Sequence, residues 1–175
     1  MCLCVRLCVC VWFIHKHYGV LSRSIIDEAE NRAARNDGCW KSRYTLQGSS
    51  DEMHVADLPG ASRILAARLP EIAEVAARSL LPPPLGARDM RVYNALIVRY
   101  DALMRCDHMP AHADFSLITV NIALNSGFEG GGTWFQALGG DGGEVVSAVD
   151  TGHAVLHAGG LVEILKRELY RNFVL

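Results

Sequence analysis

The chain has 175 residues, a formal net charge of −2 and 50% hydrophobic residues. This length fits one domain that can bury a core, and the balanced charge excludes the basic bias by which proteins attract nucleic-acid phosphates. We therefore expect one domain over residues 21–175, with no nucleic-acid partner, preceded by a segment of different character over residues 1–20.

The N-terminal segment alternates Cys or Arg with Val or Leu from Cys2 to Val11. A repeated GT dinucleotide translates as alternating Cys and Val, so we interpret the segment as a translated simple repeat. Two alternatives stay open, a targeting signal, which would imply the secretory pathway, and an edge strand. We expect no membrane span, because Arg6 interrupts the apolar run and the run is shorter than the ~20 residues that a bilayer requires. The compartment is otherwise not given by these residues.

The cysteines do not indicate a disulfide framework. Four of the six lie in that segment, which leaves Cys39 and Cys106. Two cysteines make no framework, and the Cys-x-Cys spacings lack the second ligand cluster of a zinc site.

Two helices are predicted ahead of the β-rich part. The first runs from about Ser24, a suitable N-cap, to Asp37 before Gly38. The second runs from about Ala61 to Leu80, with Pro70 expected to kink or split it. We expect these helices to buttress one sheet. Between them we predict a strand over Trp40 to Leu46 and a polar loop over Gly48 to Glu52.

Short apolar runs from Arg91 onward predict a series of strands, as in a sandwich or barrel. The glycine-rich segment from Gly139 to Gly143 predicts a hairpin turn. The predicted strands are Val92–Tyr100, Leu117–Leu124, Thr133–Leu138, Glu144–Val149, His153–His157 and Leu169–Leu175.

His112 and Asp114 stand two residues apart at the head of a β-type run. Residues i and i+2 of a strand point the same way, so an imidazole and a carboxylate can reach one metal ion together. They supply two thirds of a 2-His-1-carboxylate triad, whose open positions suit non-haem Fe(II).

These residues resemble the Fe(II)/2-oxoglutarate dioxygenases, in particular the prolyl 4-hydroxylase and lysyl hydroxylase branch. The resemblance covers about Leu21 to Ala158. It implies an α+β, β-rich fold, a double-stranded β-helix (jelly-roll) core with N-terminal buttressing helices. It also implies Fe(II), 2-oxoglutarate and ascorbate as cofactors, O₂ as co-substrate and a peptidyl or small organic substrate. The matching segments are VRYD (98–101), HAD (112–114), TVNIALN (119–125), GGGTWF (130–135) and GHAVL (152–156).

The resemblance also implies the residues that hold 2-oxoglutarate. Tyr100 and Thr133 would contact it through their hydroxyls. Its distal carboxylate needs a cation, ideally an arginine that binds it through two hydrogen bonds. We expect Arg171 in this role, with Arg167 as the alternative.

The C-terminal part departs from the family pattern at the third metal ligand. No histidine follows His157, and Glu163 stands where the second iron-binding histidine is expected. Three possibilities stay open: His157 is the ligand, Glu163 is the ligand, or the site is incomplete. Of the two residues, His157 is favoured, because an imidazole preserves the charge of the site and suits iron.

Two functions follow. The first is a 2-oxoglutarate-dependent dioxygenase that hydroxylates a prolyl, lysyl or similar side chain. The second is a catalytically impaired relative that serves as a binding module. The third ligand discriminates between them.

Overall fold

The computed structural model describes a backbone of two helices and nine short strands within parts of residues 19–174. The N-terminal repeat, most of the strand predicted over Trp40 to Leu46, and Arg167 and Arg171 lie outside the described residues. The described residues are 19–36, 38, 40, 51–101, 108–128, 130, 132–138, 142–147, 150–160, 162–165 and 172–174.

The two helices are α1, Gly19–Ala34, and α2, Pro59–Leu80. Pro59 occupies the first turn of α2, where its missing N–H costs no hydrogen bond. The predicted split at Pro70 is wrong, because α2 continues through it as one element. Pro70 and Ala66, four residues earlier, are both exposed, so water can bind the carbonyl that the proline leaves unpaired. No helix among the described residues has the length and apolarity needed to cross a membrane.

A side chain of α1 caps the N-terminus of α2. The carboxylate of Glu28 accepts hydrogen bonds from the backbone N–H groups of Gly60 at 2.9 Å and Ala61 at 2.7 Å. The residue before the helix, Leu58, provides no side-chain cap. Glu28 thus binds two of the unpaired donors of α2 and meets the positive end of its dipole. A Cβ atom at Gly60 would lie 2.6 Å from Glu28 Oε2, so a larger residue there would displace the Glu28 carboxylate.

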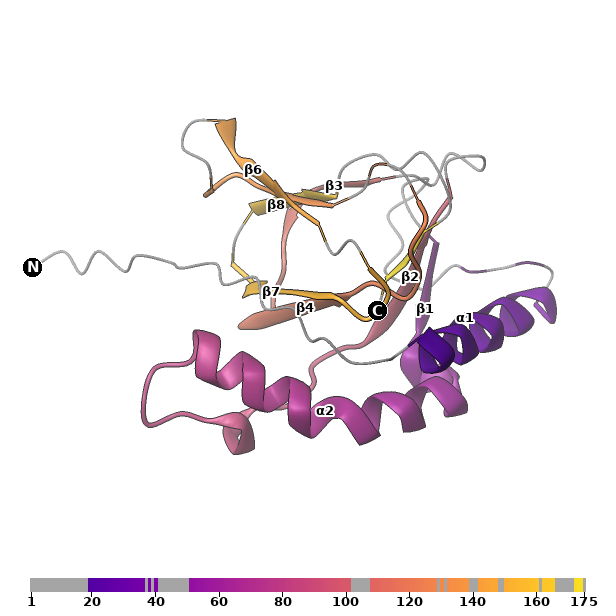
Figure 1. Cartoon of the computed structure of the whole chain (residues 1–175), viewed down its shortest axis with the longest axis horizontal. Helices are drawn as coiled ribbons and strands as arrows, with labels where there is room; N and C mark the ends of the chain where they lie inside the picture. Colours follow the sequence, from indigo (N-terminus) through magenta and orange to yellow (C-terminus); the bar gives the residue numbers. More distant parts are fainter. Residues whose placement is uncertain are drawn as a thin grey trace, which may run out of the picture.

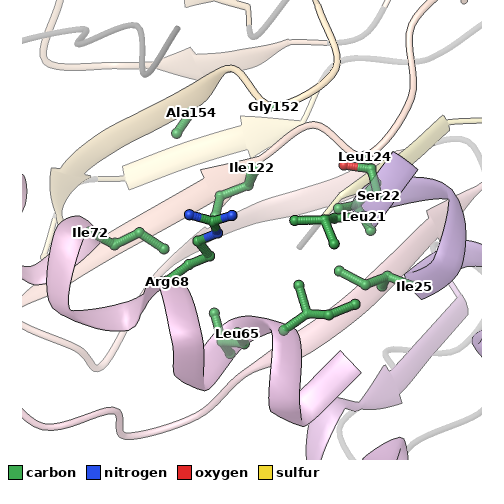
Figure 2. Close-up of a pocket in the computed structure, with 11 residues that line it drawn as sticks. Leu21, Ser22, Ile25, Leu65, Arg68, Ile72, Ile122, Leu124, Gly152 and Ala154 are labelled. Atoms are coloured by element: carbon green, nitrogen blue, oxygen red, sulfur yellow. The ribbon is translucent and has the colours of Figure 1, made fainter. Parts of the chain in front are cut away.

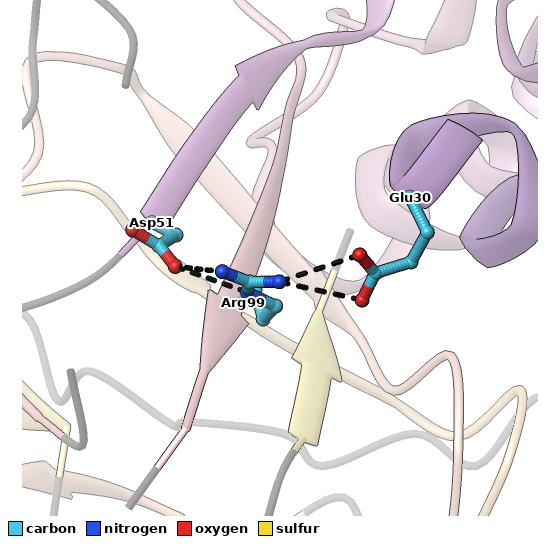
Figure 3. A network of polar contacts seen from close by, with 3 residues as sticks. All are labelled: Glu30, Asp51 and Arg99. Carbon is cyan, nitrogen blue, oxygen red and sulfur yellow. Dashed lines mark hydrogen bonds and ion pairs between the residues drawn. The ribbon is translucent and has the colours of Figure 1, made fainter. Parts of the chain in front are cut away.

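A largely covered arginine joins α1 to the first strands. Arg99 of β2, Leu96–Tyr100, donates to Asp51 of β1, Asp51–His54, and to Glu30 of α1 at 3.3 Å (Figure 3). Its guanidinium also lies 4.6 Å from the centre of the Trp40 ring. The Arg99 side chain is only 12% exposed, so these partners replace most of its water. Strand β1 overlaps the predicted Gly48–Glu52 loop, and pairing with β2 explains why polar residues are extended there.

The strands form three antiparallel sets, with the helices together on one side (Figure 1). Their orders are β1-β2-β9, β3-β8-β5-β6 and β4-β7. The remaining bounds are β3 Met109–Ala113, β4 Ile118–Ile122, β5 Thr133–Phe135, β6 Glu144–Val146, β7 Ala154–Ala158, β8 Val162–Leu165 and β9 Asn172–Val174, with 3-10 turns at Val55–Asp57 and Ala87–Asp89.

The two faces of the β4-β7 pair have different roles. Val120 and Leu156, paired in register, pack with Ala76 of α2 on one face. On the other face His157 meets the ring of Phe135, which belongs to the four-stranded sheet. The β4-β7 pair is therefore a layer between α2 and the four-stranded sheet, whereas α1 packs with Met53 of β1 and Ile97 of β2.

The structure corrects the strand prediction at two places. Strand β3 was not predicted as a separate element. Strand β8 occupies the start of a run, Val162 to Leu169, whose spacing of Glu163 and Arg167 also suits a helix; residues 162–165 form a strand instead. Strand β8 pairs with β3 on one side and β5 on the other, and two ladders stabilise the extended backbone more than one helical side-chain pair would.

Candidate metal and cosubstrate site

The structure brings His112 and Asp114 together. His112 lies in β3 and Asp114 follows its last residue. His112 Nε2 lies 3.5 Å from Asp114 Oδ1, and both side chains are 28% exposed. Two atoms that each bind one ion at about 2.0–2.2 Å lie about 2.8–3.6 Å apart, so this pair fits one metal ion that solvent can reach.

A backbone carbonyl fixes the orientation of the His112 ring. Nδ1 of His112 lies 2.9 Å from the carbonyl oxygen of Pro110. A carbonyl only accepts, so Nδ1 carries a proton, and neutral His112 therefore presents the lone pair of Nε2 toward Asp114. When His112 is charged, its Nε2 carries a proton that faces Asp114. When His112 is neutral, the space between Nε2 and Asp114 Oδ1 suits a cation.

Asp114 is an ionised carboxylate. Its pKa is lowered to about 2, chiefly by its contact with His112 and further by a hydrogen bond from Thr119, while burial acts in the opposite direction. Thr119 Oγ1 donates to Asp114 Oδ2, and Ser116 Oγ lies 2.8 Å from Thr119 Oγ1. No role was predicted for these two hydroxyls from the sequence. The sequence pattern could have indicated the role of Thr119, because Thr119 and Asn121 form a polar strand face, whereas Ile118 and Val120 lie on the other face.

His157, the third ligand expected from the sequence, lies close enough to this pair for the charges of Asp114 and His112 to act on it. Its side chain is fully buried, and its Nδ1 lies 3.1 Å from the carbonyl oxygen of Ala158. Burial lowers the pKa of His157, while the nearby charge of Asp114 raises it and that of His112 lowers it. Among the described side chains, no three His, Cys, Asp or Glu residues form a cluster that could hold a metal ion. The completion of the triad by His157 stays a prediction.

The backbone register places residue 163 beside His112. Residue 163 of β8 lies directly opposite His112 of β3 and opposite Phe135 of β5. Directly opposed residues belong to the same face of an antiparallel sheet, and the Phe135 ring faces His157 of the other layer. Positions 112, 163 and 135 therefore form one row on the inner face.

Two of the residues expected to hold 2-oxoglutarate, Thr133 and Tyr100, are buried in strands of two different sheets. Thr133 is buried in β5 and shares the face of Phe135, two residues later. Tyr100 is 1% exposed in β2, on the face opposite to Ile97 and Arg99, which pack toward the helices. Tyr100 pairs with Asn172 of β9, whereas the expected cation Arg171 lies outside the described residues.

A separate cavity of about 50 Å³ lies on the helix side of β4-β7 (Figure 2). Arg68 of α2 reaches into it among apolar side chains that include Ile72 and Ile122. Its lining is apolar apart from Ser22 and Arg68 and contains no imidazole or carboxylate that could bind a metal ion. This cavity is also separated from His112 and Asp114 by the β4-β7 layer.

Comparison with known proteins shows the fold. No protein-family model and no curated protein matches the chain. The structure is similar to a Pseudomonas putida prolyl-4-hydroxylase, with a TM-score of 0.61 and 14% identity over 89% of this chain and 83% of that one. It is also similar to SnoN, a non-heme alpha ketoglutarate dependent epimerase from nogalamycin biosynthesis, with a TM-score of 0.58 and 16% identity over 89% of this chain and 71% of that one. The chain therefore has the fold of 2-oxoglutarate-dependent oxygenases.

Proposed function

We propose that this protein is an Fe(II)- and 2-oxoglutarate-dependent dioxygenase that hydroxylates a prolyl, lysyl or similar side chain. The observation that carries the proposal is the pair of His112 Nε2 and Asp114 Oδ1, 3.5 Å apart, in a fold shared with enzymes of this kind. Imidazole and carboxylate are the ligands that non-haem Fe(II) sites use.

The strand layers support a double-stranded β-helix as the frame of the proposed site. The sheet β3-β8-β5-β6 faces β4-β7 through the contact of Phe135 with His157. Tyr100 and Thr133, both buried, would orient 2-oxoglutarate through their hydroxyls in the space between the layers. Arg171, as the resemblance implies, would bind its distal carboxylate through two hydrogen bonds.

Each residue has a defined task in the proposed reaction. His112 and Asp114 bind the metal, the ring of His112 being held by Pro110 and the carboxylate by Thr119. The bound Fe(II) supplies the oxidising chemistry, in which R–H, 2-oxoglutarate and O₂ give R–OH, succinate and CO₂. Ascorbate would keep the metal reduced.

The third ligand is assigned to position 163 in this proposal. The register places this position opposite His112, and opposed Cβ atoms are only about 4.5–5.5 Å apart. His157 is the alternative, because it lies in β7 directly opposite Thr119, which donates to Asp114. With Glu163 as a ligand, the site would have one histidine and two carboxylates. Its net charge would be one unit lower than that of a site with two histidines and one carboxylate. This weakens the attraction for the dianion 2-oxoglutarate.

The second function, a catalytically impaired binding module, is favoured by the same lack of a three-ligand cluster among the described side chains. An anaerobic titration with Fe(II) and then 2-oxoglutarate separates the two. The enzyme develops the weak visible absorption band of the chelated complex, then forms succinate when O₂, ascorbate and a peptide library are added. His112→Ala and Asp114→Ala are the controls that lose both signals. A protein that binds neither Fe(II) nor 2-oxoglutarate is the binding module.

A further inference from the structure

Two hydroxyl groups form a directed hydrogen-bond chain that ends on Asp114. Thr119 Oγ1 donates its single hydrogen to Asp114 Oδ2, because an ionised carboxylate only accepts. The hydrogen in the 2.8 Å contact between Ser116 and Thr119 must therefore come from Ser116 Oγ. The order of donation is Ser116 to Thr119 to Asp114.

These hydrogen bonds give the two carboxylate oxygens of Asp114 different roles. Oδ2 is held by Thr119, while Oδ1 lies 3.5 Å from His112 Nε2. His112 is divided in the same way, with Nδ1 on the carbonyl of Pro110 and Nε2 toward Asp114. Each residue thus has one polar atom fixed by the protein and one directed at the shared space.

Thr119 is a firm support because its backbone belongs to a regular ladder. It lies in β4 directly opposite His157, and every residue of β4 has a partner in β7. The pairing is extended by the hydrogen bond from Gly159 N to Leu117 O at 3.1 Å. Asp114 itself lies beyond the end of β3, so Thr119 ties it to the neighbouring layer.

We infer that Thr119, supported by Ser116, is a positioning residue that makes Asp114 a one-oxygen ligand through Oδ1 and thereby selects Fe(II)-like or Mn(II)-like ions against Ca²⁺. The inference rests on the proposed metal site. Calcium takes six to eight oxygen ligands and often binds both oxygens of a carboxylate at about 2.3–2.6 Å. Holding Oδ2 in a hydrogen bond disfavours that mode and leaves a single ligand oxygen for the smaller ion.

The test measures Mn(II) and Ca²⁺ affinity of the full chain by calorimetry, with Mn(II) binding followed also by electron paramagnetic resonance. Thr119→Val, which keeps the shape and removes the hydroxyl, is expected to weaken Mn(II) binding about 10–100-fold, as loss of outer-shell partners does, and to raise the ratio of Ca²⁺ to Mn(II) affinity. Thr119→Ser, which keeps the hydroxyl, should have the Mn(II) affinity and the Ca²⁺ to Mn(II) ratio of the parent. Ser116→Ala should change both quantities in the same direction as Thr119→Val, but less. Thr151→Val, which removes an exposed hydroxyl bonded to Ser126 at 3.4 Å, is the matched control.

Thermal midpoints without metal show whether each variant folds. If Thr119→Val does not fold, the metal affinities of Thr119→Ser and Ser116→Ala decide the test. Wild-type affinities and an unchanged Ca²⁺ to Mn(II) ratio in folded Thr119→Val, together with loss of Mn(II) binding in Asp114→Ala, overturn the positioning role and leave the metal site standing. Wild-type Mn(II) binding in Asp114→Ala overturns the metal site and this inference with it.

Discussion

The ring of Phe135 meets the imidazole of His157 edge to face, with 4.9 Å between ring centres and 62° between ring planes. Phe135 belongs to β5 and His157 to β7, so the contact joins the four-stranded sheet to the β4-β7 pair. It also fixes which face of the four-stranded sheet is the inner one. The row that contains Phe135 runs through position 163 to His112 on that face.

The position of the third ligand can be tested along this row. Glu163→His should raise Fe(II) affinity about tenfold or more and strengthen the 2-oxoglutarate absorption band, because it supplies a second imidazole opposite His112. Glu144→His is the matched control, since residue 144 pairs with Phe135 in the same row but lies two strands from β8. His157→Gln should leave Fe(II) affinity unchanged. Loss of iron binding in His157→Gln with no gain in Glu163→His would show instead that His157 is the ligand.

Burial of His157 should make stability depend on pH. Its pKa in the folded protein lies below the ordinary 6.5, so the unfolded chain binds more protons between the two values. The contribution is fully present above about pH 6.5 and is lost as the pH falls from there toward the lower pKa of the folded protein. Urea unfolding of metal-free protein between about pH 7.5 and 5.5 measures this. His157→Leu should lose less stability on acidification than the parent, whereas the exposed substitution His108→Leu should behave like the parent. Equal slopes for His157→Leu and parent would exclude the effect.

Two neighbouring glycines give a matched pair for the turn that follows β7. A Cβ at Gly159 would lie 1.9 Å from the carbonyl oxygen of Ser116, whereas a Cβ at Gly160 would meet nothing within 4 Å. Gly159→Ala is expected to lower the free energy of unfolding by about 1–3 kcal/mol and to weaken Mn(II) binding, because it displaces the serine that supports Thr119 and Asp114. Gly160→Ala should change neither. Chemical denaturation and Mn(II) titration check both variants, and similar behaviour of the two would contradict the close approach.

The cap of α2 by Glu28 should contribute measurably to stability. Glu28→Gln removes the charge that faces two backbone N–H groups and should lower the free energy of unfolding by about 1–2 kcal/mol. Glu74→Gln, at an exposed position within α2, should change the free energy of unfolding little. Since Glu28 is remote in sequence from the proposed site, Mn(II) affinity of the folded variant should stay at the parent value. An unchanged unfolding midpoint in Glu28→Gln would mean that water caps the helix equally well.

Local sequence patterns predicted much of the fold because they act over a few residues. Ile25, Ile26 and Ala29, whose spacing suits one face of a helix, lie in the buried stripe of α1, and runs bounded by Gly or Asp predicted β4, β5 and β7 in place. The two-residue spacing of His112 and Asp114 was sufficient to predict that they meet, since a strand repeats every second residue.

Only the tertiary structure decided how distant strands combine. The opposition of position 163 to His112, the hydroxyl chain from Ser116 to Asp114 and the capping of α2 by Glu28 join residues through pairing registers and helix packing that no local period encodes. The strand at Val162–Leu165 shows the same limit, because its own spacing also suits a helix and the ladders to β3 and β5 make it extended. The sequence alone thus determined which ligand-type residues exist and which local elements carry them. Long-range backbone hydrogen bonding determined which of them share a face.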